Sequence, residues 1–138
     1  MNVLLVEDNP GDIRLMREAL RNGIPSKNLT AVEDGEEALA YLRQQGPYTN
    51  APKPDLIFLD LNLPRKDGRE VLLEIKNDDL LRSIPVVVLT TSEAERDVIF
   101  AYELHANCYV KKPTDLDEYM EVIRACENFW LHVVRLPR

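Results

Sequence analysis

Cysteine and histidine are scarce in this sequence, which excludes several kinds of site. The chain of 138 residues has two cysteines, Cys108 and Cys126, and two histidines, His105 and His132. The cysteines lack the spacing of a metal-binding motif, and neither histidine has an acidic or histidine neighbour at a useful spacing. We therefore expect both thiols to be free packing residues. The histidines are expected to be surface or packing residues, not ligands or phosphate carriers.

Long apolar runs and an excess of positive charge are also missing. No segment approaches the roughly 18 apolar residues of a membrane span, and the N-terminus lacks the pattern of a secretory signal. The chain has 24 acidic and 17 basic residues, a formal net charge of -7, which argues against nucleic acid as the main partner. We expect a cytoplasmic protein that binds neither nucleic acid nor a membrane.

Short apolar segments alternate with amphipathic ones along the whole chain. The connections between the apolar segments are too long for hairpins, so the alternation predicts a parallel sheet with right-handed crossovers and helices on both faces. The expected fold is α/β and flavodoxin-like, a doubly wound (βα)5 domain with strand order 2-1-3-4-5, spanning residues 1–138 without an effector domain. The predicted strands cover residues 2–6, 29–32, 56–59, 84–89 and 108–110, and helices are predicted at about 10–20, 34–43, 94–105 and 115–128 and around Val71, Leu72 and Ile75.

Polar side chains follow four of these strands. Glu7 and Asp8 come after the first strand, Asp60 after the third, Thr90 after the fourth and Lys112 after the fifth. In the predicted strand order the first and third strands are neighbours, and the carboxyl ends of parallel strands meet at one edge of the sheet. We therefore expect all five side chains to lie at one site.

Three crowded carboxylates at this edge need a counter-charge. Each pair repels by about 4 kcal/mol at near-surface separations, so the cluster must bind protons or a cation. Ligands that are all oxygen favour Mg²⁺, with Mn²⁺ as a substitute, over zinc. We predict direct ligation by Asp8 and Asp60, direct or water-mediated ligation by Glu7, and a contribution from the backbone carbonyl of Asn62.

A carboxylate beside a metal and a lysine is also typical of phosphoryl transfer, which depends on positioning and charge neutralisation. Asp60 would then be the nucleophile that forms an acyl phosphate, while Lys112 pairs with the phosphoryl oxygens and Thr90 donates its hydroxyl. Taken one by one, these residues have simpler interpretations as a solvated strand end, a surface charge and a β-former. Their joint position at strand ends favours the functional interpretation.

The motifs resemble a known family. Glu7-Asp8, Asp60 with the following Leu61-Asn62-Leu63-Pro64 and Asp67-Gly68, Thr90, and Lys112-Pro113 are similar to the receiver domain of two-component response regulators. This resemblance covers nearly the entire chain.

The resemblance implies that Asp60 accepts a phosphoryl group from the phosphohistidine of a sensor histidine kinase. It also implies that Asp8, Asp60 and the Asn62 carbonyl bind Mg²⁺. Thr90 and Lys112 would contact the phosphate, and the bond between Lys112 and Pro113 would be cis. Tyr109 fits the aromatic residue that turns inward when the threonine moves.

Two positions vary within this family. Glu7 stands where many receivers have aspartate, and Ser92 lies where the residue type tunes dephosphorylation. The proline-containing connector over residues 44–54 and the ending Phe129–Val134 resemble stand-alone regulators paired with bacterial and cyanobacterial phytochrome kinases. The implied partner is therefore a sensor kinase of the phytochrome type.

Apolar residues in the fourth and fifth helices exceed what one buried face requires. They predict a partner surface on the fourth helix, fifth strand and fifth helix, which an isologous homodimer would bury. The alternative is an ordinary core helix with a loose tail. The predicted surface comprises Val98, Phe100, Tyr102, Tyr119, Val122, Phe129 and Trp130.

The sequence favours a phosphorylatable signalling switch that is not an enzyme in its own right. One alternative is a Mg²⁺-dependent phosphatase or mutase with an aspartyl nucleophile. That class usually has a second acid two residues after the nucleophile, where this chain has Asn62. Another alternative is an interaction module that works without phosphorylation, but Asp8, Asp60 and Lys112 are all retained.

Overall fold

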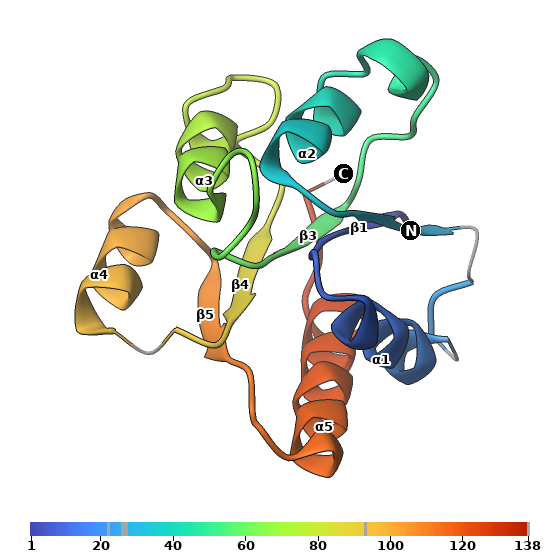
Figure 1. Cartoon of the computed structure of the whole chain (residues 1–138). Coiled ribbons are helices and arrows are strands. Elements are labelled where there is room, and N and C mark those ends of the chain that lie inside the picture. The colour runs from blue at the N-terminus through green and yellow to red at the C-terminus, as the bar shows by residue number, and fades with distance from the viewer. Residues whose placement is uncertain (22, 26–27, 93, 138) are drawn as a thin grey trace.

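A parallel β-sheet forms the centre of the molecule (Figure 1). The computed structural model describes residues 1–21, 23–25, 28–92 and 94–137. Over these residues the sheet has five strands in the order β2-β1-β3-β4-β5, and every neighbouring pair is parallel. This confirms the predicted flavodoxin-like topology. The strands are β1 (Val3–Val6), β2 (Leu29–Val32), β3 (Leu56–Leu59), β4 (Val86–Thr90) and β5 (Cys108–Lys111).

Helices cover both faces of the sheet. Helices α1 (Pro10–Leu20) and α5 (Leu116–Glu127) pack together on one face, while α2 (Gly35–Leu42), α3 (Gly68–Lys76) and α4 (Glu95–Glu103) lie on the other (Figure 1). The longest α-helix, α5, has 12 residues, and among the described helices none has the length and apolar character needed to cross a membrane.

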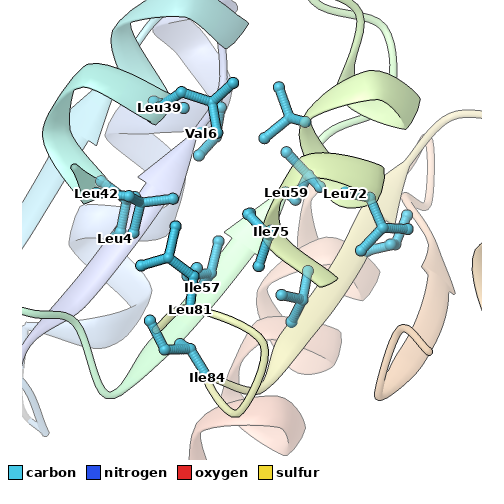
Figure 2. Packing of buried hydrophobic residues seen from close by; sticks show 14 of the residues in the cluster. Leu4, Val6, Leu39, Leu42, Ile57, Leu59, Leu72, Ile75, Leu81 and Ile84 are labelled. Carbon is cyan, nitrogen blue, oxygen red and sulfur yellow. The ribbon is translucent and has the colours of Figure 1, made fainter. Parts of the chain in front are cut away.

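Each face of the sheet carries its own buried cluster, because successive side chains of a strand point to opposite faces. Leu4, Ile57 and Leu59 pack under α2 and α3, as Figure 2 shows. Leu5 and Phe58 belong to the opposite cluster, which α1 and α5 cover. Strands β1, β3 and β4 are thus buried on both faces, which explains why their sequences are continuously apolar rather than alternating.

Four of the helices begin at side-chain caps. Asn9 accepts hydrogen bonds from the N–H groups of two residues in α1, and Asp34, Asp67 and Asp115 cap α2, α3 and α5 in the same way. Helix α4 follows Ala94, which makes no side-chain cap. These caps set the starts of the helices close to the predicted positions.

The boundaries differ from the prediction in a few places. Strand β4 begins at Val86 rather than Ile84 and includes Thr90. The connector over residues 44–54 contains a 3₁₀ turn, Gly46–Tyr48. Beyond α5 the chain continues as a π-helical segment, Asn128–Val133.

Candidate functional site

Three carboxylates meet at the carboxyl edge of the sheet. The β1–β3 register pairs Val6 with Leu59, so Glu7 and Asp60, which follow these residues, emerge side by side. Glu7, Asp8 and Asp60 each offer an oxygen, and these oxygens lie within 4.8 Å of one another. Glu7 and Asp60 are buried, whereas Asp8 is exposed. This all-oxygen donor set suits a hard divalent cation, as the sequence predicts.

Gly68 allows the chain after Asp60 to pack closely. A Cβ atom on Gly68 would lie 2.2 Å from the carbonyl oxygen of Asp60 and 2.5 Å from the Cα of Leu61. Both contacts are with backbone, which cannot move aside easily. Glycine at the first position of α3 therefore lets this helix start directly against the loop that contains Asp60 and Leu61.

The ammonium group of Lys112 lies among the acids. Its Nζ donates to Glu7 Oε1, to Asp12 Oδ2 at 2.9 Å and to Asp60 Oδ2 at 3.0 Å. The Lys112 N–H donates to the carbonyl of Thr90 at 2.7 Å, which fixes the chain after β5 beside β4. The side chain of Lys112 is only 4 % exposed. The structure thus brings the predicted lysine to the predicted carboxylates.

One ammonium cannot neutralise all these acids. Burial would lower the pKa of Lys112, but the hydrogen bonds to Glu7 and Asp12 and the charges of Glu7 and Asp60 outweigh it, so its pKa is raised. Burial also raises the pKa of Glu7, to about 7, with Lys112 acting in the opposite direction and the charge of Asp60 adding to the rise. Without a metal, Lys112 stays charged and Glu7 gains or loses its proton close to neutral pH.

The raised pKa of Glu7 predicts how the stability of the metal-free chain depends on pH. A group with a higher pKa in the folded state stabilises that state fully below its unfolded pKa, here 4.5, and loses this contribution as pH rises through about 7. The contribution of Glu7 is expected to fall by about 3 kcal/mol over this range. Urea unfolding of wild type and Glu7→Gln, both in a chelator at about pH 5 and about pH 8, measures it.

The free energy of unfolding of wild type should decrease with pH relative to Glu7→Gln, because the amide does not titrate. If the two proteins keep a constant difference across this range, Glu7 does not have the raised pKa.

Thr90 and Asn62 also lie at the predicted positions. Thr90 is fully buried at the end of β4, and its Oγ1 accepts a hydrogen bond from the Ser92 N–H at 3.4 Å. The Asn62 N–H donates to Asp60 Oδ1 at 3.2 Å. The Asn62 carbonyl as a metal ligand stays a prediction.

Tyr109 is half-buried beside this edge of the sheet. Its hydroxyl donates to the Ser92 carbonyl at 2.7 Å, and its ring packs against the cluster under α2 and α3. Burial raises the pKa of the Tyr109 phenol, and the hydrogen bond to Ser92 lowers it less. Its role as a switch stays a prediction.

One expectation from the family resemblance is wrong. None of the described peptide bonds is cis, so the bond between Lys112 and Pro113 is trans. The trans form of a bond before proline is favoured by about 0.5 to 1 kcal/mol, so proline permits a cis bond without requiring one.

The predicted partner surface is only partly exposed. Phe100, Tyr102 and Phe129 are exposed, whereas Val98, Val122 and Trp130 are half-buried. Tyr119 is only 3 % exposed, so the prediction that it belongs to this surface is wrong. It lies in the cluster between α1 and α5, because Tyr119 and Ile123 are one helical turn apart on the core-facing side of α5.

The two cysteines are free thiols, as predicted, and the two histidines lie at the surface. Cys108 and Cys126 are free and half-buried, and burial raises the pKa of both thiols. His105 and His132 are exposed, and His132 lies 3.9 Å from Glu127.

Sequence reasoning missed several polar residues around the site. Asp12 also forms an ion pair with Lys112. Its position in the first turn of α1, shortly after Glu7 and Asp8, could have indicated that it lies near the site. Arg69 of α3 pairs with Asp97 of α4, and the Ser92 hydroxyl donates to the same carboxylate at 2.6 Å. No sequence signal indicates this pair, because 28 positions separate its members.

Comparison with known proteins identifies the family. The response regulator receiver domain family matches residues 3–124. This chain belongs to the response regulator receiver domains. The receiver domain is 53 % identical over 135 residues to the response regulator Rcp1 of Synechocystis sp. strain PCC 6803, covering 98 % of this chain and 92 % of that protein.

Solved structures give the same result for the fold of the receiver domain. It is similar to the phosphorylated cyanobacterial phytochrome response regulator RcpA, with a TM-score of 0.96 and 53 % identity, covering 99 % of this chain and 98 % of that one. The Mn²⁺-bound form of Rcp1 matches with a TM-score of 0.95 and 52 % identity over the same shares of the two chains. The bacteriophytochrome response regulator AtBRR matches with a TM-score of 0.73 and 41 % identity, covering 97 % of each chain.

Proposed function

We propose that this receiver domain accepts a phosphoryl group on Asp60 from the phosphohistidine of a sensor histidine kinase, in a Mg²⁺-dependent reaction. One observation carries the proposal: Glu7, Asp8 and Asp60 converge within 4.8 Å, with the Lys112 ammonium 3.0 Å from Asp60. Asp60 supplies the nucleophilic oxygen, a new O–P bond forms, and the P–N bond to the kinase histidine breaks.

Glu7, Asp8 and Asp60 would hold the Mg²⁺, or Mn²⁺ in its place, together with the Asn62 carbonyl. A bound cation would offset negative charge on the phosphoryl oxygens. The Mn²⁺-bound form of Rcp1 and the phosphorylated form of RcpA, both more than half identical to this chain, support metal binding and phosphorylation.

Lys112 and Thr90 would recognise the phosphoryl group. The Lys112 ammonium already lies 3.0 Å from the Asp60 carboxylate, so a small movement would pair it with an oxygen of the acyl phosphate. Thr90 is buried at the adjacent strand end, where its hydroxyl can donate to another oxygen. The new anion, of charge roughly -1.5 to -2, is the signal to which these two residues respond.

A single contact to the phosphate is too weak to complete a switch. One charge-assisted hydrogen bond contributes about 1.5 to 3 kcal/mol. Shifting a two-state equilibrium from almost entirely the inactive conformation to almost entirely the active one takes about 5.5 kcal/mol. The remainder must come from Lys112 and from a partner that binds the phosphorylated form more tightly.

The proposed phosphoryl donor is a kinase of the phytochrome type, which the similarity to phytochrome response regulators supports. Phosphotransfer profiling tests it: radiolabelled histidine kinases of phytochrome and unrelated types are each mixed with the receiver domain. We expect transfer from the phytochrome type to be at least about tenfold faster, a preference of about 1.4 kcal/mol. Equal rates from all kinases would contradict the pairing.

The proposed dimer uses the exposed apolar residues of the α4-β5-α5 face. Phe100 and Tyr102 of α4 are 38 % and 50 % exposed, and Phe129, after α5, is 47 % exposed. Burying them against a second copy would remove apolar surface from water. Sedimentation with and without beryllofluoride tests this; a monomer in both conditions would contradict the dimer.

We also propose that the domain has no enzymatic turnover of its own. The position two residues after the nucleophile is Asn62, so the general acid that a phosphatase or mutase of this kind needs is not supplied there. Multiple turnover of small phosphomonoesters would contradict this. The net charge of -7 supports the further proposal that nucleic acid is not a partner and that the protein works in the cytoplasm, away from membranes.

A further inference from the structure

A bidentate ion pair joins α3 to α4 beside the candidate site. Arg69 Nε donates to Asp97 Oδ1 at 2.9 Å, and Arg69 Nη2 donates to Asp97 Oδ2 at 2.7 Å. The Asp97 side chain is 9 % exposed. Arg69 Nη1 also contacts Asp67, the cap of α3, at 3.0 Å. The Arg69 guanidinium is therefore bound by Asp97 and by Asp67, and these contacts favour one fixed orientation of its side chain.

The same Asp97 carboxylate reaches the segment after β4. The Ser92 hydroxyl donates to Asp97 Oδ2 at 2.6 Å. The Ser92 backbone then contacts both predicted switch residues: its N–H donates to Thr90 Oγ1 at 3.4 Å, and its carbonyl accepts from the Tyr109 hydroxyl at 2.7 Å. A continuous polar chain thus runs from α3 through α4 to Thr90 and Tyr109.

This chain of contacts reaches the first turn of α4. Ala94 provides no side-chain cap, and Asp97 is the buried acid in the first turn of α4. Arg69 and then Ser92 hold the pKa of Asp97 down to about 2, so the pair keeps its charge across the physiological pH range.

We propose that Arg69, acting through Asp97 and Ser92, is a positioning residue that holds Thr90 and Tyr109 in the arrangement that receives the phosphoryl group. This inference rests on the proposed function of Asp60. Arg69 does not touch the acid cluster; it determines what fraction of molecules has the segment after β4 in the receiving arrangement. Apparent affinity for a phosphoryl group falls in proportion to that fraction.

Two binding measurements separate positioning from general structural damage. Arg69→Gln should weaken binding of beryllofluoride, with Mg²⁺ present, by about three- to tenfold. Its affinity for Mg²⁺ alone should stay within about twofold of wild type, because Glu7, Asp8 and Asp60 are unchanged. Arg69→Lys keeps the charge without the fork, so its beryllofluoride affinity should be intermediate. Arg96→Gln is the matched control. Arg96 is the neighbour of Asp97 in α4 and its charge also acts on that carboxylate, but its replacement leaves the hydrogen bonds from Arg69 to Asp97 in place.

A spectroscopic readout reports on Tyr109 directly. Fluorotyrosine is incorporated into the full chain, and Tyr109→Phe identifies the Tyr109 signal among the five tyrosines. Without any phosphoryl analogue, fluorine NMR should show a shifted or broadened Tyr109 signal in Arg69→Gln and an unchanged one in Arg96→Gln. Circular dichroism confirms that each variant is folded at the temperature used.

The proposal is overturned if Arg69→Gln retains both the wild-type Tyr109 signal and the wild-type beryllofluoride affinity. It is also overturned if Mg²⁺ affinity falls as much as beryllofluoride affinity, because Arg69 would then support the whole site. Failure of the proposed function gives a different result: wild type itself would bind no beryllofluoride, while the Tyr109 signal would still report whether Arg69 positions the segment.

Discussion

Replacing Asp60 by asparagine is expected to abolish phosphoryl incorporation from acetyl phosphate and Mg²⁺, lowering radiolabelling by at least about 100-fold. Asp60 contacts the Lys112 ammonium, belongs to the carboxylate cluster and is the nucleophile of the proposed reaction. An amide of the same size preserves the packing and removes the nucleophilic carboxylate. Radiolabelling followed by denaturing electrophoresis, or intact-mass analysis, measures the incorporation.

Asp79→Asn is the matched control for this experiment. The side chain of Asp79 is 86 % exposed and lies on the surface after α3, so its replacement should leave labelling unchanged. Labelling of Asp60→Asn at the wild-type level would show that a neighbouring acid, such as Asp8, is the acceptor. If wild type and Asp60→Asn both remain unlabelled, the interaction module that works without phosphorylation becomes the better explanation.

The second large effect is expected for Lys112→Met. Removing one member of a buried ion pair typically costs about 3 to 5 kcal/mol, because the partner charge is left without compensation. Here Glu7 and Asp60 are both buried and share the same ammonium. Removing it therefore leaves the negative charge of both acids without compensation. We expect a loss of this size, about 3 to 5 kcal/mol, in the free energy of unfolding of the metal-free chain. Urea unfolding in a chelator measures it.

Added Mg²⁺ should then distinguish an electrostatic loss from a packing loss. A cation bound only by the folded state stabilises it according to its concentration and affinity, and Lys112→Met presents it with a more negative site. Mg²⁺ should therefore raise the stability of Lys112→Met more than that of wild type. Lys53→Met, at an exposed lysine before β3, should change stability by less than about 0.5 kcal/mol. Equal losses in the two variants would contradict the central role of Lys112.

The fold was predictable because its signals are local. The apolar run Leu56–Leu59 could only be a short strand buried on both faces, and Asp34 and Asp115 precede their helices as side-chain caps. The topology followed from alternation and handedness. The main members of the site followed from a general rule, since residues after neighbouring parallel strands gather at one edge.

Other features of the site depend on how far-apart helices are rotated and placed. Asp12 reaches Lys112 across 100 positions, and Arg69 meets Asp97 only because α3 and α4 lie side by side on the same face of the sheet. The burial of Tyr119 depends on which side of α5 faces α1. Proline left both isomers open for the Lys112–Pro113 bond, and the packed structure has the trans form.

The amino-acid sequence by itself determined the order of the elements, the strand arrangement and the five residues of the predicted site, because periodicity, capping and the parallel-sheet edge are properties of short segments. Only the tertiary structure decided that Asp12 shares Lys112 with Glu7 and Asp60, and that Arg69, Asp97 and Ser92 connect α3 to Thr90. Such contacts arise when whole helices settle against the sheet, and the geometry of that packing is not encoded in any one segment.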